Sequence, residues 1–202
     1  MRVGVLASGA GTNLQAILDR VHGSHGVEVV AVGTDQPGAQ ALERAESAGV
    51  PTATFALAGA SDRVARDRAI ADWLEEAGVE LVVLAGYMAL LDPAFLARFP
   101  QRVINVHPAL LPAFPGLRAV EQALDYGVKV FGVTVHFVDD GVDTGPVIAQ
   151  RALELPDATD PAAVREVLRP LEHDLLCEAV ELIARGAAAI DPEHPRRVVI
   201  RR

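Results

Sequence analysis

An amide and an imidazole two positions apart are the side chains of this sequence best placed to carry out chemistry together. They are Asn105 and His107, in the segment Ile104–Gly116, which reads INVHPALLPAFPG. Apolar residues at positions 104 and 106 predict a strand, so Asn105 and His107 share its opposite face. Open α/β sheets bind ligands at the carboxyl ends of their strands. An amide donor beside an imidazole there suits stabilisation of an oxyanion while a proton moves.

The same spacing also has a purely structural interpretation. An Asn at the end of a strand can form an Asx-turn, and a His can pack in a crevice without any catalytic role. Pro108, Pro112 and Pro115 would stiffen the loop that follows and hold both side chains in place. The spacing alone leaves catalysis and structure equally open.

A second candidate segment, Ser8–Gln15, reads SGAGTNLQ and follows the first predicted strand. Gly9 and Gly11 let backbone amides approach an anion at the start of a helix. A Walker loop is excluded because no Gly-Lys-Ser/Thr follows, and Leu14 occupies the third glycine position of the dinucleotide fingerprint. Asp35, after the second predicted strand, would still suit a ribose hydroxyl. A nicotinamide cofactor therefore stays an alternative to a simple phosphate group.

Short β-branched runs alternate with helical segments along the chain, which is the pattern of βαβ units. The predicted fold is α/β: a single-domain, Rossmann-like, mostly parallel twisted sheet flanked by helices. Strands are predicted at Val3–Ala7, Val27–Thr34, Thr52–Phe55, Glu80–Gly86, Arg102–Val106, Lys129–Val138 and Pro146–Leu155, the last pairing antiparallel with its predecessor. Helices are predicted at Asn13–Val21, Ala39–Ala48, from an N-cap at Ser61 to Ala77, after the pair Asp92-Pro93, and at Asp160–Arg185. A kink or break is expected before Pro170. Residues 1–186 would form the catalytic domain, and residues 187–202 a tail that adds an edge strand.

Composition excludes several classes of protein. The chain has 202 residues, half of them hydrophobic, which is enough for one good core. A net charge of −9 argues against a nucleic-acid partner. No stretch approaches the roughly 20 apolar residues of a membrane span, and the N-terminus lacks a signal peptide. Cys177 is the only cysteine, so an internal disulfide and a cysteine zinc site are excluded. We expect a cytoplasmic protein without nucleic-acid or membrane partners, as a monomer or homodimer.

The segment from Asn105 resembles the signature of the folate-dependent formyltransferases, N-x-H-P-S/A-L-L-P followed by a proline-glycine turn. The second half of that signature is present as DDGVDTGPVIAQ, Asp139–Gln150, with Asp143 lying 36 positions after His107. The match runs in one register from the N-terminus to about Gly186. It implies a formyltransferase fold and transfer of a formyl group from 10-formyltetrahydrofolate, the co-substrate, with no metal. The first loop resembles the phosphate loop of members that formylate glycinamide ribonucleotide in de novo purine biosynthesis.

The resemblance implies a role for each matching residue. Asn105 would donate to the oxyanion, protonated His107 would stabilise it and act as general acid, and Asp143 would favour the imidazolium and relay a proton. Glycinamide ribonucleotide is expected on Gly11, Thr12, Asn13, Gly116, Arg169 and Glu172. The folate is expected on Arg63, Met88, Ala89, Leu90, Leu91, Asn105, Asp139 and Asp140. Two positions depart from the family pattern: Ala89 stands where many relatives have arginine, and Pro170 follows Arg169.

Several alternatives stay open at this stage. Methionyl-tRNA formyltransferases and formyltetrahydrofolate hydrolases resemble the same segments, so another folate-dependent formyltransferase or a hydrolase is the main competing function. Both kinds of enzyme carry an additional domain, which is the argument against them. A nicotinamide oxidoreductase and a catalytically silent relative are further candidates. Arg63 could be an ordinary exposed arginine, and Arg169 with Glu172 an ordinary solvated helix face. Asp139, Asp140 and Asp143 could instead form a divalent-metal cluster.

Overall fold

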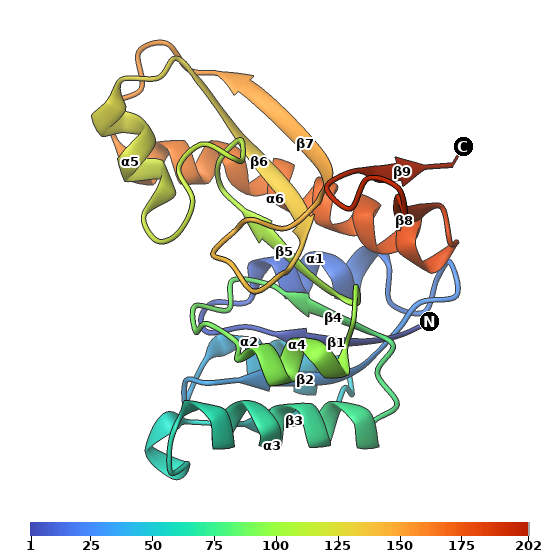
Figure 1. Ribbon diagram of the computed structural model, residues 1–202. Coiled ribbons are helices and arrows are strands. Elements are labelled where there is room, and N and C mark those ends of the chain that lie inside the picture. The colour runs from blue at the N-terminus through green and yellow to red at the C-terminus, as the bar shows by residue number, and fades with distance from the viewer. Residues whose placement is uncertain (202) are drawn as a thin grey trace. The chain divides into compact units, whose positions relative to one another are not determined.

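The computed structural model describes residues 1–201 and has the predicted α/β fold (Figure 1). Its strands are β1 (Arg2–Leu6), β2 (Glu28–Thr34), β3 (Thr52–Thr54), β4 (Leu81–Leu84), β5 (Val103–His107), β6 (Val130–Phe137), β7 (Val147–Glu154), β8 (Ala188–Ile190) and β9 (Val198–Ile200). Its helices are α1 (Thr12–Arg20), α2 (Gln40–Ser47), the short 3₁₀ helix η1 (Leu57–Gly59), α3 (Arg63–Glu76), α4 (Pro93–Arg98), α5 (Ala119–Tyr126) and α6 (Pro161–Ala184). Seven of these strands form one sheet in the order β3-β2-β1-β4-β5-β6-β7. The residues group into two compact units, Met1–Asn105 and the part from Val106 onward.

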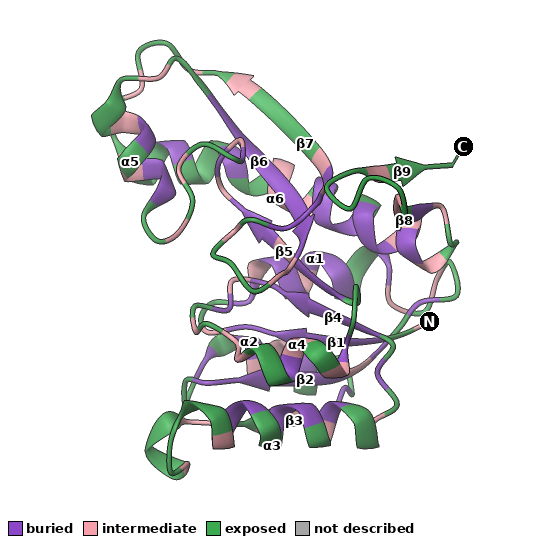
Figure 2. Cartoon of the chain, viewed as in Figure 1, coloured by how far each residue is buried: buried purple, intermediate pink, exposed green. Residues whose placement is uncertain are grey.

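The first unit, Met1–Asn105, is a parallel sheet with helices on both faces. β1 pairs with β2 and β4, and every strand pair within the unit is parallel. Helices α1 and α2 pack against each other, as do α3 and α4 (Figure 1). The central strands β1 and β4 are almost entirely buried (Figure 2). Their runs RVGVL and LVVL are apolar on both faces, which is why they occupy the middle of the sheet.

The second unit is built on an antiparallel strand pair. β6 and β7 pair with each other from Val130 opposite Glu154 to His136 opposite Val147. Helix α6 packs on both strands and also contacts α5. Its buried side chains recur at helical spacing and are mostly apolar: Val164, Leu168, Leu175, Leu176, Cys177, Ala179, Val180 and Ile183. The predicted antiparallel neighbour of the long strand is therefore confirmed.

Helix α5, Ala119–Tyr126, has no counterpart among the predicted elements. It begins after Arg118, which adopts a left-handed backbone (φ 59°) and makes no side-chain cap. Ser, Thr, Asp or Asn is the usual N-cap residue of a helix, and none of them stands at this position. A smaller correction concerns α3, where Asp62 and not Ser61 is the N-cap: its carboxylate accepts from Ala65 N–H at 2.8 Å.

The C-terminal tail was expected to add an edge strand, and it forms strand β9 outside the main sheet. β9 pairs antiparallel with β8 in a separate two-stranded sheet. A turn brings the two strands together, because Asp191 N–H donates to Arg197 O and Arg197 N–H donates to His194 O. The tail's only bridge to β7 joins Arg197 and Val147 among the described residues.

Helix α6 continues through Pro170 from Pro161 to Ala184, so the expected break is wrong. A proline inside a helix removes one backbone hydrogen bond and crowds the carbonyl four residues earlier. Leu168 before Pro170 and Leu175 after it are both buried, at 0% and 1% exposure. Burial of apolar side chains on either side offsets the local cost and keeps the helix whole.

Replacing Pro170 by alanine is expected to raise the free energy of unfolding by about 1–3 kcal/mol, because the backbone donor is restored and the ring clash is removed. Pro170 is exposed, so little packing is lost with the ring. Urea denaturation measures the change. Glu166→Ala, an exposed position on the same helix, is the matched control and should change stability by less than about 0.5 kcal/mol. A Pro170→Ala protein less stable than the parent would contradict this account.

Candidate active site

His107 is the last residue of β5, and both of its ring nitrogens face oxygen atoms. Nε2 lies 2.8 Å from the backbone oxygen of Phe114, and Nδ1 lies 3.3 Å from Oδ2 of Asp143. The residue is 5% exposed. A carbonyl oxygen only accepts hydrogen bonds, so Nε2 donates to Phe114 O, while Nδ1 faces the carboxylate of Asp143.

Asp143 brings together four separate parts of the second unit. Its Oδ2 accepts from Gly116 N–H at 2.8 Å, and its Oδ1 lies 3.5 Å from Nε2 of His136. Burial raises the pKa of Asp143, but the hydrogen bonds from His136 and Gly116 and the charges of the two histidines outweigh it and lower the pKa to about 2. Asp143 is therefore a carboxylate at neutral pH. Its left-handed backbone, φ 53°, is uncommon for a residue other than glycine.

The loop after His107 is held in place by two polar side chains of β6 and β7. Thr134 donates from its hydroxyl to Ala109 O at 2.6 Å and accepts from Leu111 N–H at 3.1 Å. Gln150 donates to Leu111 O at 2.8 Å and to the Thr134 hydroxyl at 2.9 Å. Thr134 is fully buried, so these bonds are shielded from water. They fix the start of the loop whose later residues return to the histidine and the carboxylate.

The structure therefore brings together three of the predicted site residues: His107, Asp143 and Gly116. It adds His136, which is 1% exposed and also donates from Nδ1 to Phe137 O, 2.8 Å away. The contact of His136 with Asp143 gives it a structural role beside His107. Asn105 is partly exposed on β5, paired with Leu84. The proposed contact of Asn105 with substrate stays a prediction.

The remaining predicted residues of the second unit are Asp139 and Asp140 after β6 and Arg169 and Glu172 on α6. Asp139 accepts from the Thr144 hydroxyl at 2.6 Å and from Gly141 N–H at 3.2 Å, so its carboxylate stabilises the turn between β6 and β7. Asp140 is exposed. On α6, Arg169 is exposed and Glu172, one turn later, is partly buried. Their substrate contacts stay predictions.

In the first unit, the predicted phosphate loop begins helix α1 as expected. Gly11 is the N-cap in a left-handed backbone, φ 69°, and a Cβ there would lie 2.8 Å from the Cα of Ala41, so glycine is required. The loop is tied to α2, because Arg44 Nε donates to Ala10 O at 2.8 Å and Ala41 N–H donates to Gly9 O at 3.2 Å. The N-cap residue Gly11 supplies no side-chain cap to α1, and the positive end of the helix dipole there favours an anion.

Asp35, considered above as a partner for a ribose hydroxyl, is engaged inside the protein. Its Oδ1 accepts from the Ser8 hydroxyl at 2.5 Å, and its Oδ2 accepts from the Gln36 amide at 2.9 Å. The carboxylate is buried, at 9% exposure. These contacts give Asp35 a structural role and remove the main support for a nicotinamide site.

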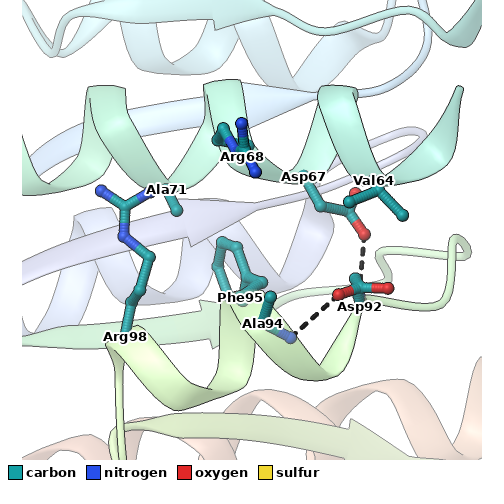
Figure 3. Close-up of a pocket in the computed structure, with 8 residues that line it drawn as sticks. All are labelled: Val64, Asp67, Arg68, Ala71, Asp92, Ala94, Phe95 and Arg98. Carbon is teal, nitrogen blue, oxygen red and sulfur yellow. Dashed lines mark hydrogen bonds between the residues drawn. The ribbon is translucent and has the colours of Figure 1, made fainter. Parts of the chain in front are cut away.

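The predicted folate segment presents large apolar side chains to the outside. Met88 is 66% exposed and Leu90 is 56% exposed, while Ala89 and Leu91 are partly buried. Exposed apolar side chains next to each other suit an apolar ring system as ligand. Arg63, the first residue of α3, is exposed, which fits either a folate carboxylate or a solvated arginine. A small hollow between α3 and α4 (Figure 3) is lined by none of the predicted site residues.

Two structural features are absent from residues 1–201. No group of three or more His, Cys, Asp or Glu side chains is arranged to hold a metal ion. No helix in this range is long and apolar enough to cross a lipid bilayer.

A mostly parallel α/β sheet with an Asn-x-His pair on β5 and a histidine-bound carboxylate after β6 defines the class as an α/β formyltransferase. Residues 1–180 match the family model described as "Formyl transferase", and the chain belongs to this family. It is 46% identical over 183 residues to the phosphoribosylglycinamide formyltransferase of Mycobacterium tuberculosis, covering 91% of this chain and 85% of that protein. The corresponding Bacillus subtilis protein is 41% identical over 170 residues, with 84% and 87% covered. The crystal structure of glycinamide ribonucleotide transformylase 1 from Symbiobacterium toebii, 46% identical, superposes with a TM-score of 0.95 over 100% of this chain and 94% of that one.

The low pKa of Asp143 predicts a pH-dependent contribution to stability. A carboxyl whose pKa falls from its ordinary 3.8 to about 2 on folding stabilises the native state above pH 4 and loses that contribution as the pH falls from about 4 to 2. The contribution at neutral pH is about 2 kcal/mol. The difference in unfolding free energy between the parent protein and Asp143→Asn should therefore shrink over this range in urea titrations. Asp125→Asn, exposed on α5, is the control, and a difference independent of pH would contradict the prediction.

Proposed function

We propose that this protein transfers the formyl group of 10-formyltetrahydrofolate to the amine of glycinamide ribonucleotide, a step of purine biosynthesis carried out in the cytoplasm. The observation that carries the proposal is the contact between His107 and the partly buried carboxylate of Asp143. It occurs in a chain 46% identical to a protein named phosphoribosylglycinamide formyltransferase. Asn105, which precedes His107 by two residues, completes the proposed catalytic set.

The ribonucleotide binds through its phosphate to the loop of Gly11, Thr12 and Asn13. The glycine backbone and the N-terminus of α1 support this assignment, since both favour an anion. Arg169 adds a positive charge for the phosphate, and Glu172 accepts from a ribose hydroxyl. Gly116, whose left-handed backbone (φ 81°) leaves room beside it, allows close approach of the substrate.

The folate binds on the segment Met88–Leu91, where exposed apolar side chains flank backbone groups that can pair with the edge of the ring. Ala89 has a methyl group where arginine is frequent in the family, but a backbone contact does not depend on that side chain. Arg63 pairs with a carboxylate of the folate tail. Asp139 and Asp140 line the folate site through their loop, with the Asp139 carboxylate keeping that loop in shape.

Formyl transfer requires that one oxyanion is stabilised and that one proton is transferred. The amine attacks the formyl carbon, a new C–N bond forms, and the carbonyl oxygen becomes an oxyanion. Asn105 donates its side-chain N–H to that oxygen, and the His107 imidazolium stabilises it from Nε2, which is released from Phe114 O when substrate binds. As the bond to N10 of the folate breaks, the proton lost by the amine passes to N10. Asp143 stays ionised, since its pKa of about 2 is far below neutral pH, and accepts a hydrogen bond from a water molecule that takes the proton from the amine and delivers one to N10.

The direct test mixes the purified protein with 10-formyltetrahydrofolate and glycinamide ribonucleotide and follows deformylation of the folate by absorbance. We expect turnover only when both substrates are present. Turnover with the folate alone would instead identify a hydrolase, and turnover with a different amine acceptor but not with the ribonucleotide would identify another formyltransferase.

Substitutions at the catalytic set should lower turnover far more than binding. Asn105→Ala removes one oxyanion donor and is expected to lower kcat about 100- to 1,000-fold, the usual effect of losing such a donor. Asp143→Asn removes the charge beside His107 and should also reduce kcat sharply, with a smaller change in KM. Steady-state kinetics at pH 7 measure both effects, with Asp125→Asn as the charge-matched control. Near-parental kcat in either variant would refute the role assigned to that residue.

A further inference from the structure

Ser8 connects the two segments of the first unit that are proposed to bind substrates. It stands at the start of the phosphate loop, and besides its contact with Asp35 its described polar contacts are with Gly86, just before the folate segment, and with Met88 within it. Its backbone N–H donates to Gly86 O at 3.1 Å, and its hydroxyl oxygen accepts from Met88 N–H at 2.9 Å. Met88 lies 80 positions later in the chain.

The direction of these hydrogen bonds is fixed by Asp35. A serine hydroxyl has a single proton, and an ionised carboxylate only accepts. The proton of Ser8 therefore lies toward Asp35 Oδ1, 2.5 Å away, which leaves the oxygen lone pairs for Met88 N–H. Gln36 donates to the other oxygen of Asp35, so the carboxylate itself is held from two sides. A change in the position of Ser8 is thus transmitted to the backbone of Met88.

The other end of the folate segment is fixed independently. Asp67 accepts from Asp92 N–H at 2.8 Å, and Figure 3 shows its side chain pointing from α3 toward Asp92 at the start of α4. Arg66 pairs with Asp67 at 2.6 Å and donates to Leu90 O at 3.3 Å. Arg66 and Asp67 are both buried, at 5% and 1% exposure. Because this anchor belongs to α3, only the Ser8 end of the segment leads to the phosphate loop.

We propose that Ser8 is a positioning residue that couples the two substrate sites, so that binding of the ribonucleotide strengthens binding of the folate and the reverse. The inference rests on the proposed function of the segments 9–13 and 86–91. A phosphate that orders the loop also orders Ser8, and through it the Met88 backbone, before the folate arrives. The second ligand then loses less conformational entropy on binding. The coupling is reciprocal by thermodynamic necessity.

The test measures tetrahydrofolate binding to the full-length protein by calorimetry, with and without saturating glycinamide ribonucleotide. Tetrahydrofolate has no formyl group, so no reaction interferes. In the parent protein the ribonucleotide should tighten tetrahydrofolate binding by about five-fold or more. The ribonucleotide Kd, measured with and without tetrahydrofolate, should change by the same factor.

Ser8→Ala removes the hydroxyl and should reduce the coupling factor below about two-fold, whereas Ser8→Thr keeps the hydroxyl and should restore it. Ser47→Ala, which removes an exposed hydroxyl on α2, is the matched control and should behave as the parent does. The coupling factor is a ratio within one variant, so a loss of stability that weakens both ligands equally leaves it unchanged. Rescue by threonine separates loss of the hydrogen bond from general damage to the loop.

Two results would overturn the role of Ser8 while leaving the proposed function intact. One is a parent protein that binds both ligands without any coupling between them. The other is a Ser8→Ala protein that couples them as strongly as the parent. Failure of the proposed function looks different: neither ligand binds the parent protein and no formyl transfer occurs, which would overturn both proposals.

Discussion

A single, partly buried negative charge organises the candidate active site. The carboxylate of Asp143 accepts from Gly116 N–H and lies within 3.5 Å of His136 and 3.3 Å of His107. Taking a carboxylate out of water is costly unless donors replace the lost hydration. The backbone of the whole loop after His107 must therefore be shaped so that the required donors point at one residue. The left-handed φ of Asp143 and of Phe114 is the local strain that this convergence requires.

In both units, polar side chains bind backbone groups of the loops that carry the candidate site residues. The side chains of those site residues then stay available for substrates. In the second unit Thr134 and Gln150 bind the backbone after His107, although neither is a candidate for chemistry. In the first unit Ser8 and the Arg66–Asp67 pair bind the backbone of the folate segment. Met88 and Leu90 can then project outward without the segment being loose.

The helices and strands that could be predicted from the sequence are those marked by local residue patterns. Short β-branched runs marked the strands of the main sheet, and Asp92-Pro93 and Asp160-Pro161 marked the starts of α4 and α6. The errors arose where long-range packing overrides a local signal. Burial on both sides of Pro170 keeps α6 continuous. Helix α5 starts from a left-handed residue without a capping side chain, so no local pattern could reveal it.

The sequence by itself determined the α/β class, the glycine loop that begins α1 and the pair Asn105 and His107 on one strand, because each depends on residues close together in the chain. The tertiary structure alone decided which polar side chains meet. That Asp143 lies against His136, that Asp35 binds Ser8 and not a ribose, and that Met88 N–H reaches Ser8 are contacts across 7 to 80 positions. Such contacts produce no periodic pattern in the sequence, since they depend on how the strands and loops pack and on where buried polar groups find partners.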